Sequence, residues 1–256
     1  MSTAQAGDVD YGRHGTGYSA LRRTDPRIAD LIHRALGPAR TVANIGAGAG
    51  SYEPSDRRVL AVEPSEAMIA QRPDSPSSVV VRAVAGALPL PDRAVDASMA
   101  TVTIHQWPDP EAGLVEMRRV TRGPVVVLTF DPDTLDRLWL AEYAPELYRA
   151  EHRRYPAVDR VVAALGGSAS VLEVAVPFDC TDGFTEAYFG RPEAFLEPSV
   201  RRAQSAWTFV DPDEEAASVE RLRADLVSGR WDARYSHLRR QSDFVGALRL
   251  VVGDPA

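Results

Sequence analysis

The fold is decided by the stretch VANIGAGAG at residues 42–50. Its first four residues predict a buried strand, and three glycines at alternate positions follow at once. A second apolar run, VLAVEP at residues 59–64, carries a carboxylate at Glu63. Strand, glycine turn, strand and acid in this order are typical of a nucleotide-binding α/β site. The turn reads G-x-G-x-G rather than G-x-G-x-x-G, which disfavours NAD as the ligand.

Apolar runs alternate with helical patterns on both sides of this stretch. A helix begins at Asp25-Pro26, where the Asp can cap it and the Pro suits its first turn, and Gly37 ends it. Valine-rich runs without polar alternation indicate strands covered on both faces, and the alternation itself indicates a parallel, doubly wound sheet. We expect strands at residues 41–45, 58–62, 78–83, 96–104, 125–130, 171–176 and 244–252, and further helices at 65–72, 109–120 and 155–165.

The chain is predicted to form one domain over residues 1–256, because that length can bury a single sizeable core. Residues 1–24 are polar and rich in glycine, which predicts an arm or lid. Residues 178–242 have a mostly helical pattern and interrupt the last two strands. An insertion of that length predicts a substrate lid. Trp207, Phe209 and Trp231 are expected in the core of this lid, and the alternative is that they line an apolar pocket for the acceptor.

Composition narrows the classes of partner. The formal net charge is −7, which disfavours a nucleic-acid partner because phosphate binding needs basic surface. All 29 basic residues are arginine, a bias that suggests a GC-rich bacterial genome. Cys180 is the only cysteine, and no apolar run approaches the ~20 residues of a membrane helix. With no signal-like stretch at the start, the chain is expected to be cytoplasmic, without a membrane partner.

Three further segments carry a family resemblance. They are LPLPD at 88–92 followed by VDA at 95–97, TVTIHQW at 101–107 and EMRRV at 116–120. Together with the glycine turn and Glu63, they resemble the class I methyltransferases that use S-adenosylmethionine (SAM), in their small-molecule type 11 branch. The resemblance covers residues 40–131 well. It implies a Rossmann-like, mostly parallel sheet of seven strands with the last one antiparallel, SAM as cofactor, a small-molecule acceptor, and a monomer or homodimer.

The resemblance also implies roles for individual residues. The glycine turn would approach the methionine part of SAM, and Glu63 would bond both ribose hydroxyls, for which a carboxylate is a natural acceptor. The loop before the fourth strand would hold adenine. The cofactor-binding residues expected in this way are Tyr11, Tyr18, Asn44, Gly46, Ala47, Gly48, Glu63, Pro64, Val84, Ala85 and Thr101.

The sequence departs from the family pattern in the cofactor region. Asn44 stands where the family usually has an acid, and Val84 where its adenine loop usually has an Asp. The link from the glycines to the next strand is short, and Pro54 interrupts it. We therefore expect no full helix there and a weak helix-dipole contribution to cofactor binding.

Methyl transfer from a sulfonium needs alignment of nucleophile, methyl and sulfur, and a base where the acceptor must lose a proton. His105 is the expected base, since it follows a strand at the edge where open α/β sheets bind ligands. The alternative is a capping or core histidine beside Trp107. Tyr11, His14 and Tyr18 are expected to close over the cofactor. No metal site is expected, and Cys180 is expected to be a packed thiol.

These observations favour a SAM-dependent methyltransferase that acts on a small, secondary-metabolite-like molecule. Three alternatives stay open: an enzyme that uses SAM without methylating, a non-catalytic SAM-binding protein, and a dinucleotide oxidoreductase. Product mass, methyl labelling of a lysate, and thermal protection by SAM or NAD would separate them.

Overall fold

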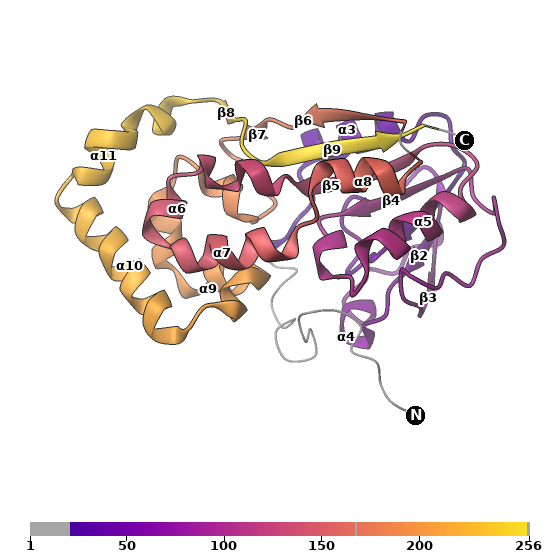
Figure 1. Ribbon diagram of the computed structural model, residues 1–256, viewed down its shortest axis with the longest axis horizontal. Helices are drawn as coiled ribbons and strands as arrows, with labels where there is room; N and C mark the ends of the chain where they lie inside the picture. Colours follow the sequence, from indigo (N-terminus) through magenta and orange to yellow (C-terminus); the bar gives the residue numbers. More distant parts are fainter. Residues whose placement is uncertain (1–20, 167, 255–256) are drawn as a thin grey trace.

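A seven-stranded sheet forms the centre of the computed structural model, which describes residues 21–166 and 168–254 (Figure 1). Its strands lie in the order β3-β2-β1-β4-β5-β9-β6, and β9 runs antiparallel to both of its neighbours. The predicted doubly wound, mostly parallel sheet with an antiparallel last strand is confirmed. The strands are β1 (Thr41–Ile45), β2 (Arg58–Val62), β3 (Ser78–Val81), β4 (Ala97–Thr101), β5 (Val125–Phe130), β6 (Ala169–Glu173) and β9 (Leu248–Gly253).

Alternate residues of a central strand enter different cores. Val126 and Leu128 of β5 belong to the cluster that includes helix α3, whereas Val125 and Val127 belong to the cluster that includes α5 and α8. All of β5 is buried, which explains why its sequence is an unbroken apolar run. The helices beside the sheet are α3 (Pro26–Ala35), α4 (Glu66–Ile69), α5 (Pro110–Val120) and α8 (Val158–Ala164).

Several predicted elements are shorter in the structure. The strand expected at 96–104 ends at Thr101, because Val102 takes a left-handed backbone angle (φ 50°) and a 3-10 turn follows at Ile104–Gln106. The strands expected at 171–176 and 244–252 are each divided. Their outer parts, β7 (Val176–Pro177) and β8 (Asp243–Phe244), pair with each other in a separate antiparallel ladder.

The β7–β8 ladder marks the base of the predicted insertion. Between them run three helices, of which α10 and α11 lie at the end of the molecule far from β3 (Figure 1). The helices of the insertion are α9 (Pro198–Arg202), α10 (Pro212–Val227) and α11 (Arg230–Tyr235), with a 3-10 turn between α9 and α10.

A second chain segment completes this helical layer and was not predicted. Residues 131–154 form α6 (Leu140–Tyr143) and α7 (Pro145–Arg154), which contact α10 and the 3-10 turn Ser205–Phe209. The two segments share an aromatic core, since the rings of Trp139 and Trp231 lie edge to face with centroids 5.3 Å apart. Trp207 and Trp231 are buried in this core, as expected. The same expectation is wrong for Phe209, which is 43% exposed and lies against the Arg154 guanidinium.

Candidate functional site

The glycine turn after β1 has a backbone that other residues could not easily adopt. Gly46, Gly48 and Gly50 have φ angles of 69°, 52° and 93°, in the region that favours glycine. A Cβ at Gly46 would overlap the side chain of Thr103, and one at Gly48 would lie 3.3 Å from the methyl group of Met68. The backbone of the turn therefore packs closely against the side chains of Thr103 and Met68, and a larger residue at Gly46 or Gly48 would disturb this packing.

Glu63 follows β2 directly and faces the turn. Its two carboxylate oxygens accept hydrogen bonds from the backbone N–H groups of Gly48 (2.8 Å) and Ser65 (2.9 Å). Burial raises the pKa of Glu63, while these two amides and the nearby Arg72 act in the opposite direction. The carboxylate is 6% exposed and is held in one orientation beside the glycines.

No helix lies between β1 and β2, as predicted, because residues 46–57 form only turns. An ion pair supports the turn from behind instead: the Arg72 guanidinium lies 2.7 Å from Glu53 and donates to the carbonyl of Gly48. The Asn44 amide donates to the same Glu53 carboxylate at 2.9 Å. Asn44 thus contacts the supporting ion pair.

A pocket opens in front of the turn, and we call it the glycine-turn pocket. Five predicted cofactor residues line it: Gly46, Ala47, Gly48, Glu63 and Thr101. Asn44, Pro64, Val84 and Ala85 lie outside its lining, with Val84 exposed at the surface and Ala85 packed in the core. Tyr11, Tyr18 and His14 fall outside the described residues. The remaining lining residues were not predicted: Arg22, Ala49, Ser51, Tyr52, Met68, Val102, Thr103, Gln106 and Asp182.

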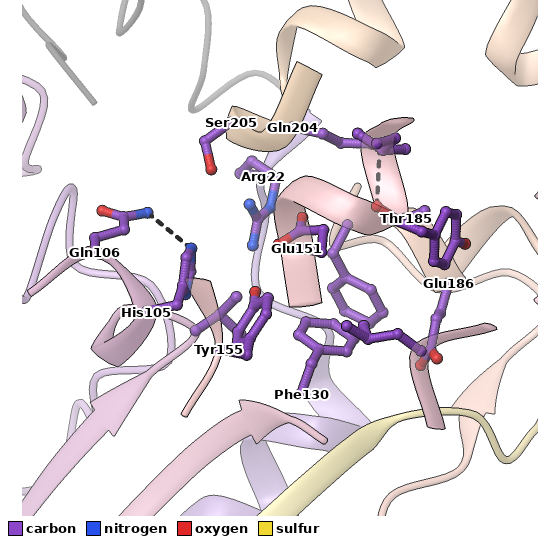
Figure 2. A pocket seen from close by; sticks show the side chains of 15 residues that line it. Arg22, His105, Gln106, Phe130, Glu151, Tyr155, Thr185, Glu186, Gln204 and Ser205 are labelled. Carbon is purple, nitrogen blue, oxygen red and sulfur yellow. Dashed lines mark hydrogen bonds between the residues drawn. The ribbon is translucent and has the colours of Figure 1, made fainter. Parts of the chain in front are cut away.

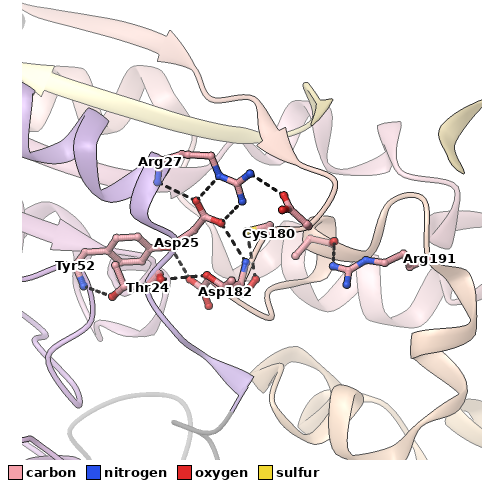
Figure 3. Close-up of polar contacts among 10 residues, drawn as sticks. Thr24, Asp25, Arg27, Tyr52, Cys180, Asp182 and Arg191 are labelled. Carbon is pink, nitrogen blue, oxygen red and sulfur yellow. Dashed lines mark hydrogen bonds and ion pairs between the residues drawn. The ribbon is translucent and has the colours of Figure 1, made fainter. Parts of the chain in front are cut away.

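Asp182 brings the helical insertion into this pocket. Its carboxylate pairs with Arg22 (2.6 Å) and accepts a hydrogen bond from the Tyr52 hydroxyl (2.9 Å). The same region is bound to the start of α3: Thr181 contacts Thr24 and Asp25, and Tyr52 contacts Thr24 (Figure 3). The contacts of Thr181 and Asp182 with residues 22–25 join positions 156 to 160 apart, so no local sequence pattern could have indicated them.

A second pocket adjoins the first, since Arg22, Val102 and Gln106 line both. We call it the aromatic pocket (Figure 2). Phe130 is central to its wall, with ring centroids 5.5 Å from Phe184 and 5.6 Å from Tyr155. Its other lining residues are His105, Leu135, Leu147, Tyr148, Glu151, Thr185, Glu186, Gln204 and Ser205.

His105 lines the aromatic pocket and not the glycine-turn pocket. Its ring lies 4.3 Å from that of Tyr155, and its Nε2 lies 3.3 Å from the Gln106 amide nitrogen. Burial, with smaller effects from Arg154 and Arg22, holds the pKa of His105 well below 6.5. The imidazole is therefore neutral near pH 7, the form that can accept a proton.

Other sequence expectations concern metals, Cys180 and membranes. Over residues 21–166 and 168–254, no three His, Cys, Asp or Glu side chains gather as a metal site would require. Cys180 is buried, and burial raises the pKa of its thiol to about 12, which makes it unreactive as expected. Among the helices described, none is long and apolar enough to cross a membrane.

Comparison with known proteins gives the class. A methyltransferase domain model matches residues 43–127. A crystal structure from Anabaena variabilis, of a protein assigned as a methyltransferase from an antibiotic biosynthesis pathway, is 30% identical. The match covers 92% of this chain and 99% of that one, with a TM-score of 0.86. The chain belongs to the class I SAM-dependent methyltransferases of type 11. It is an enzyme whose cofactor is SAM.

More distant structures share the fold. A SAM-dependent methyltransferase from Thermotoga maritima is 17% identical with a TM-score of 0.52, covering 95% of this chain and 91% of its own. Geranyl diphosphate C-methyltransferase from Streptomyces coelicolor, solved with Mg²⁺, geranyl diphosphate and S-adenosylhomocysteine, is 14% identical with a TM-score of 0.51. The match covers 90% of this chain and 77% of that one. A search of curated proteins found no match.

Proposed function

We propose that this enzyme transfers the methyl group of SAM to a small molecule bound in the aromatic pocket. The observation that carries the proposal is that the aromatic pocket and the glycine-turn pocket share three lining residues. One pocket offers a polar backbone surface and a carboxylate, whereas the other offers aromatic walls. Two molecules, one in each pocket, would therefore meet beside Val102 and Gln106. These residues lie just beyond the carboxyl end of β4, the edge at which open α/β sheets bind ligands.

The residues of the glycine-turn pocket suit SAM. Glu63 is a fixed acceptor for the two ribose hydroxyls, and Gly46 and Gly48 have no side chains of their own between the backbone and the methionine part. Thr101 and Ala47 complete this wall. We assign the adenine end to Pro64, Val84 and Ala85 on the family resemblance alone. Asn44 would act through Glu53 and the turn rather than by touching the cofactor.

Methyl transfer requires that the acceptor's nucleophile be oriented toward the methyl group. Where that nucleophile is a hydroxyl or an N–H group, its proton must also be removed. When bound, SAM supplies a methyl group on a sulfonium, a good leaving group. The aromatic walls hold the acceptor and exclude water, so that its nucleophile faces the glycine-turn pocket. His105 would take the proton that an oxygen or nitrogen nucleophile of the acceptor loses when it is methylated.

Calorimetry with SAM tests the cofactor half of the proposal. We expect Glu63→Ala to weaken SAM binding about 100-fold or more, because it removes two charged hydrogen bonds. Glu66→Ala is the matched control: this exposed acid pairs with Arg82 and should leave affinity unchanged. Equal affinities for wild type and Glu63→Ala would contradict the assignment.

Mass spectrometry tests the transfer itself. Cell extract incubated with the enzyme and methyl-deuterated SAM should yield small molecules heavier by one labelled methyl group. Transfer of label only to protein or nucleic acid would overturn the small-molecule acceptor.

A second candidate is a SAM-binding protein that does not methylate. It is favoured by the Asn44 amide, which supplies no charge and is engaged with Glu53. SAM binding together with a product of unchanged mass would support it over methyl transfer.

A further inference from the structure

The aromatic pocket contains an unusual group of buried polar atoms. In the part of the chain that the structure describes, eight buried side-chain nitrogen or oxygen atoms lack a hydrogen-bond partner. Three of them belong to residues that line this pocket: His105 Nδ1, Glu186 Oε2 and Gln204 Nε2. A buried polar atom without a partner is destabilising, so such a group indicates where a bound molecule supplies the missing partners.

Glu186 has a firmly held carboxylate. It lies in the 3-10 turn Thr185–Tyr188 of the insertion and is 3% exposed. One oxygen accepts a hydrogen bond from the backbone N–H of Ala247 at 2.6 Å, and Gly246 leaves room for it because a Cβ there would overlap the carboxylate. Thus one oxygen anchors the side chain, and Oε2 keeps its hydrogen-bonding capacity for a ligand.

Gln204 has a defined orientation as well. Its Oε1 accepts hydrogen bonds from the Thr185 hydroxyl (2.9 Å) and the Trp207 indole N–H (3.3 Å). The indole N–H can only donate, so the end of the Gln204 amide that it contacts must be the carbonyl oxygen. The other end of the amide, Nε2, is therefore a hydrogen-bond donor. The insertion therefore offers the pocket one acceptor and one donor.

The polar atoms lie on different sides of the pocket. Figure 2 shows His105 on one side and Glu186 on the other, with Tyr155 and Phe130 between them. Apolar rings between polar ends suit a flat molecule that has a polar group at each end.

We propose that Glu186 recognises the methyl acceptor by accepting a hydrogen bond from a hydroxyl group, remote from the nucleophile that faces His105. The acceptor is thus a compact aromatic molecule with at least two hydroxyl groups. This inference rests on the proposed function, because it takes the aromatic pocket as the acceptor site.

Matched naphthols test the proposal on the protein saturated with S-adenosylhomocysteine. Naphthalene-2,6-diol has hydroxyls at both ends, 6-methyl-2-naphthol replaces one by a methyl group, and 6-amino-2-naphthol replaces it by an amine. Calorimetry should show that wild type binds the diol about tenfold more tightly than the methyl analogue. Glu186→Gln should lose this preference, while Glu197→Gln, an exposed acid of the same insertion, should keep it.

The wild-type comparison decides the question even if Glu186→Gln fails to fold. Equal binding of the diol and the methyl analogue, or no binding of any probe, overturns the inference. The inference is also overturned if Glu186→Gln still prefers the diol over the methyl analogue. If the amine binds more tightly than the diol, the choice of a hydroxyl group is overturned. SAM binding and methyl gain are measured separately, so the proposed function can stand when this selectivity fails.

Discussion

Replacing Glu186 by Gln should change how the stability of the enzyme depends on pH. Burial raises the pKa of this carboxyl group from 4.5 to about 7, although the amides of Ala247 and Leu248 and the charges of Arg249 and Arg137 oppose it. The unfolded chain therefore releases the proton at lower pH than the folded protein does. Glutamine has nearly the same shape and cannot ionise, so it removes this difference.

The sign and the magnitude follow from linkage. Below pH 4.5 the carboxyl is protonated in both states and contributes nothing. Between pH 4.5 and about 7, the folded state binds more protons than the unfolded state, so the free energy of unfolding falls as pH rises. The total loss is about 3 kcal/mol, at roughly 1.4 kcal/mol per pH unit, of which about 2 to 3 kcal/mol falls between pH 5 and pH 8.

Urea unfolding at constant ionic strength measures the effect. From about pH 5 to pH 8, the free energy of unfolding of wild type should fall by about 2 to 3 kcal/mol more than that of Glu186→Gln. Any constant cost of the new amide group shifts the whole curve and leaves this difference unchanged. The low pKa of His105 acts in both proteins alike and cancels. Glu197→Gln should follow wild type. Parallel curves for wild type and Glu186→Gln would refute the reasoning.

Three other substitutions test the site. Gly46→Ala should destabilise the fold by about 2 kcal/mol or more, because it meets both a φ of 69° and an overlapping side chain. In urea unfolding, Gly37→Ala should cost less, since its φ of 59° comes with open space. Tyr52→Phe should cost about 1–3 kcal/mol by leaving a buried oxygen of Asp182 with one partner fewer. His105→Phe should slow methyl transfer to a hydroxyl by about 10²-fold or more without weakening SAM binding in calorimetry.

The central strands of the sheet could be predicted because they are covered by helices on both faces. A strand covered on both faces must be mainly apolar, and β1, β2 and β5 each have at most two polar residues. The glycine turn was predictable because positive φ angles select glycine. The prediction that no full helix follows the turn was also correct, because only residues 51–57 separate Gly50 from β2.

The helical layer was only half predictable. Helices α6 and α7 lie in residues 131–154. Helix α6 has only 4 residues, and α7 is rich in charged residues, so neither has a long apolar stripe that would predict it. Their stability comes from tertiary packing of Trp139, Tyr143 and Leu147 in the shared core. The Trp139 indole also donates to the carbonyl of Phe189 in the insertion, a contact that no local pattern reveals.

The site shows the same limit. Glu63 and the glycines are adjacent in space because parallel strands β1 and β2 are neighbours, so a motif could locate them. Asp182 and Glu186 reach the pockets from the insertion, whereas Arg22 reaches them from the chain just before α3. The assignments of Asn44, Pro64, Val84 and Ala85 to the cofactor, and of His105 to proton transfer, stay predictions.

The insertion is part of the site and not merely a cover over it. One short segment supplies Asp182 to the glycine-turn pocket and Glu186 to the aromatic pocket. Between them, Gly183 donates its N–H to the carbonyl of Leu21, which fixes this segment to the chain just before α3. The Ala247 amide holds the other end, beside the start of β9. Because this one segment lines both pockets, any movement of it would change the walls of both at once.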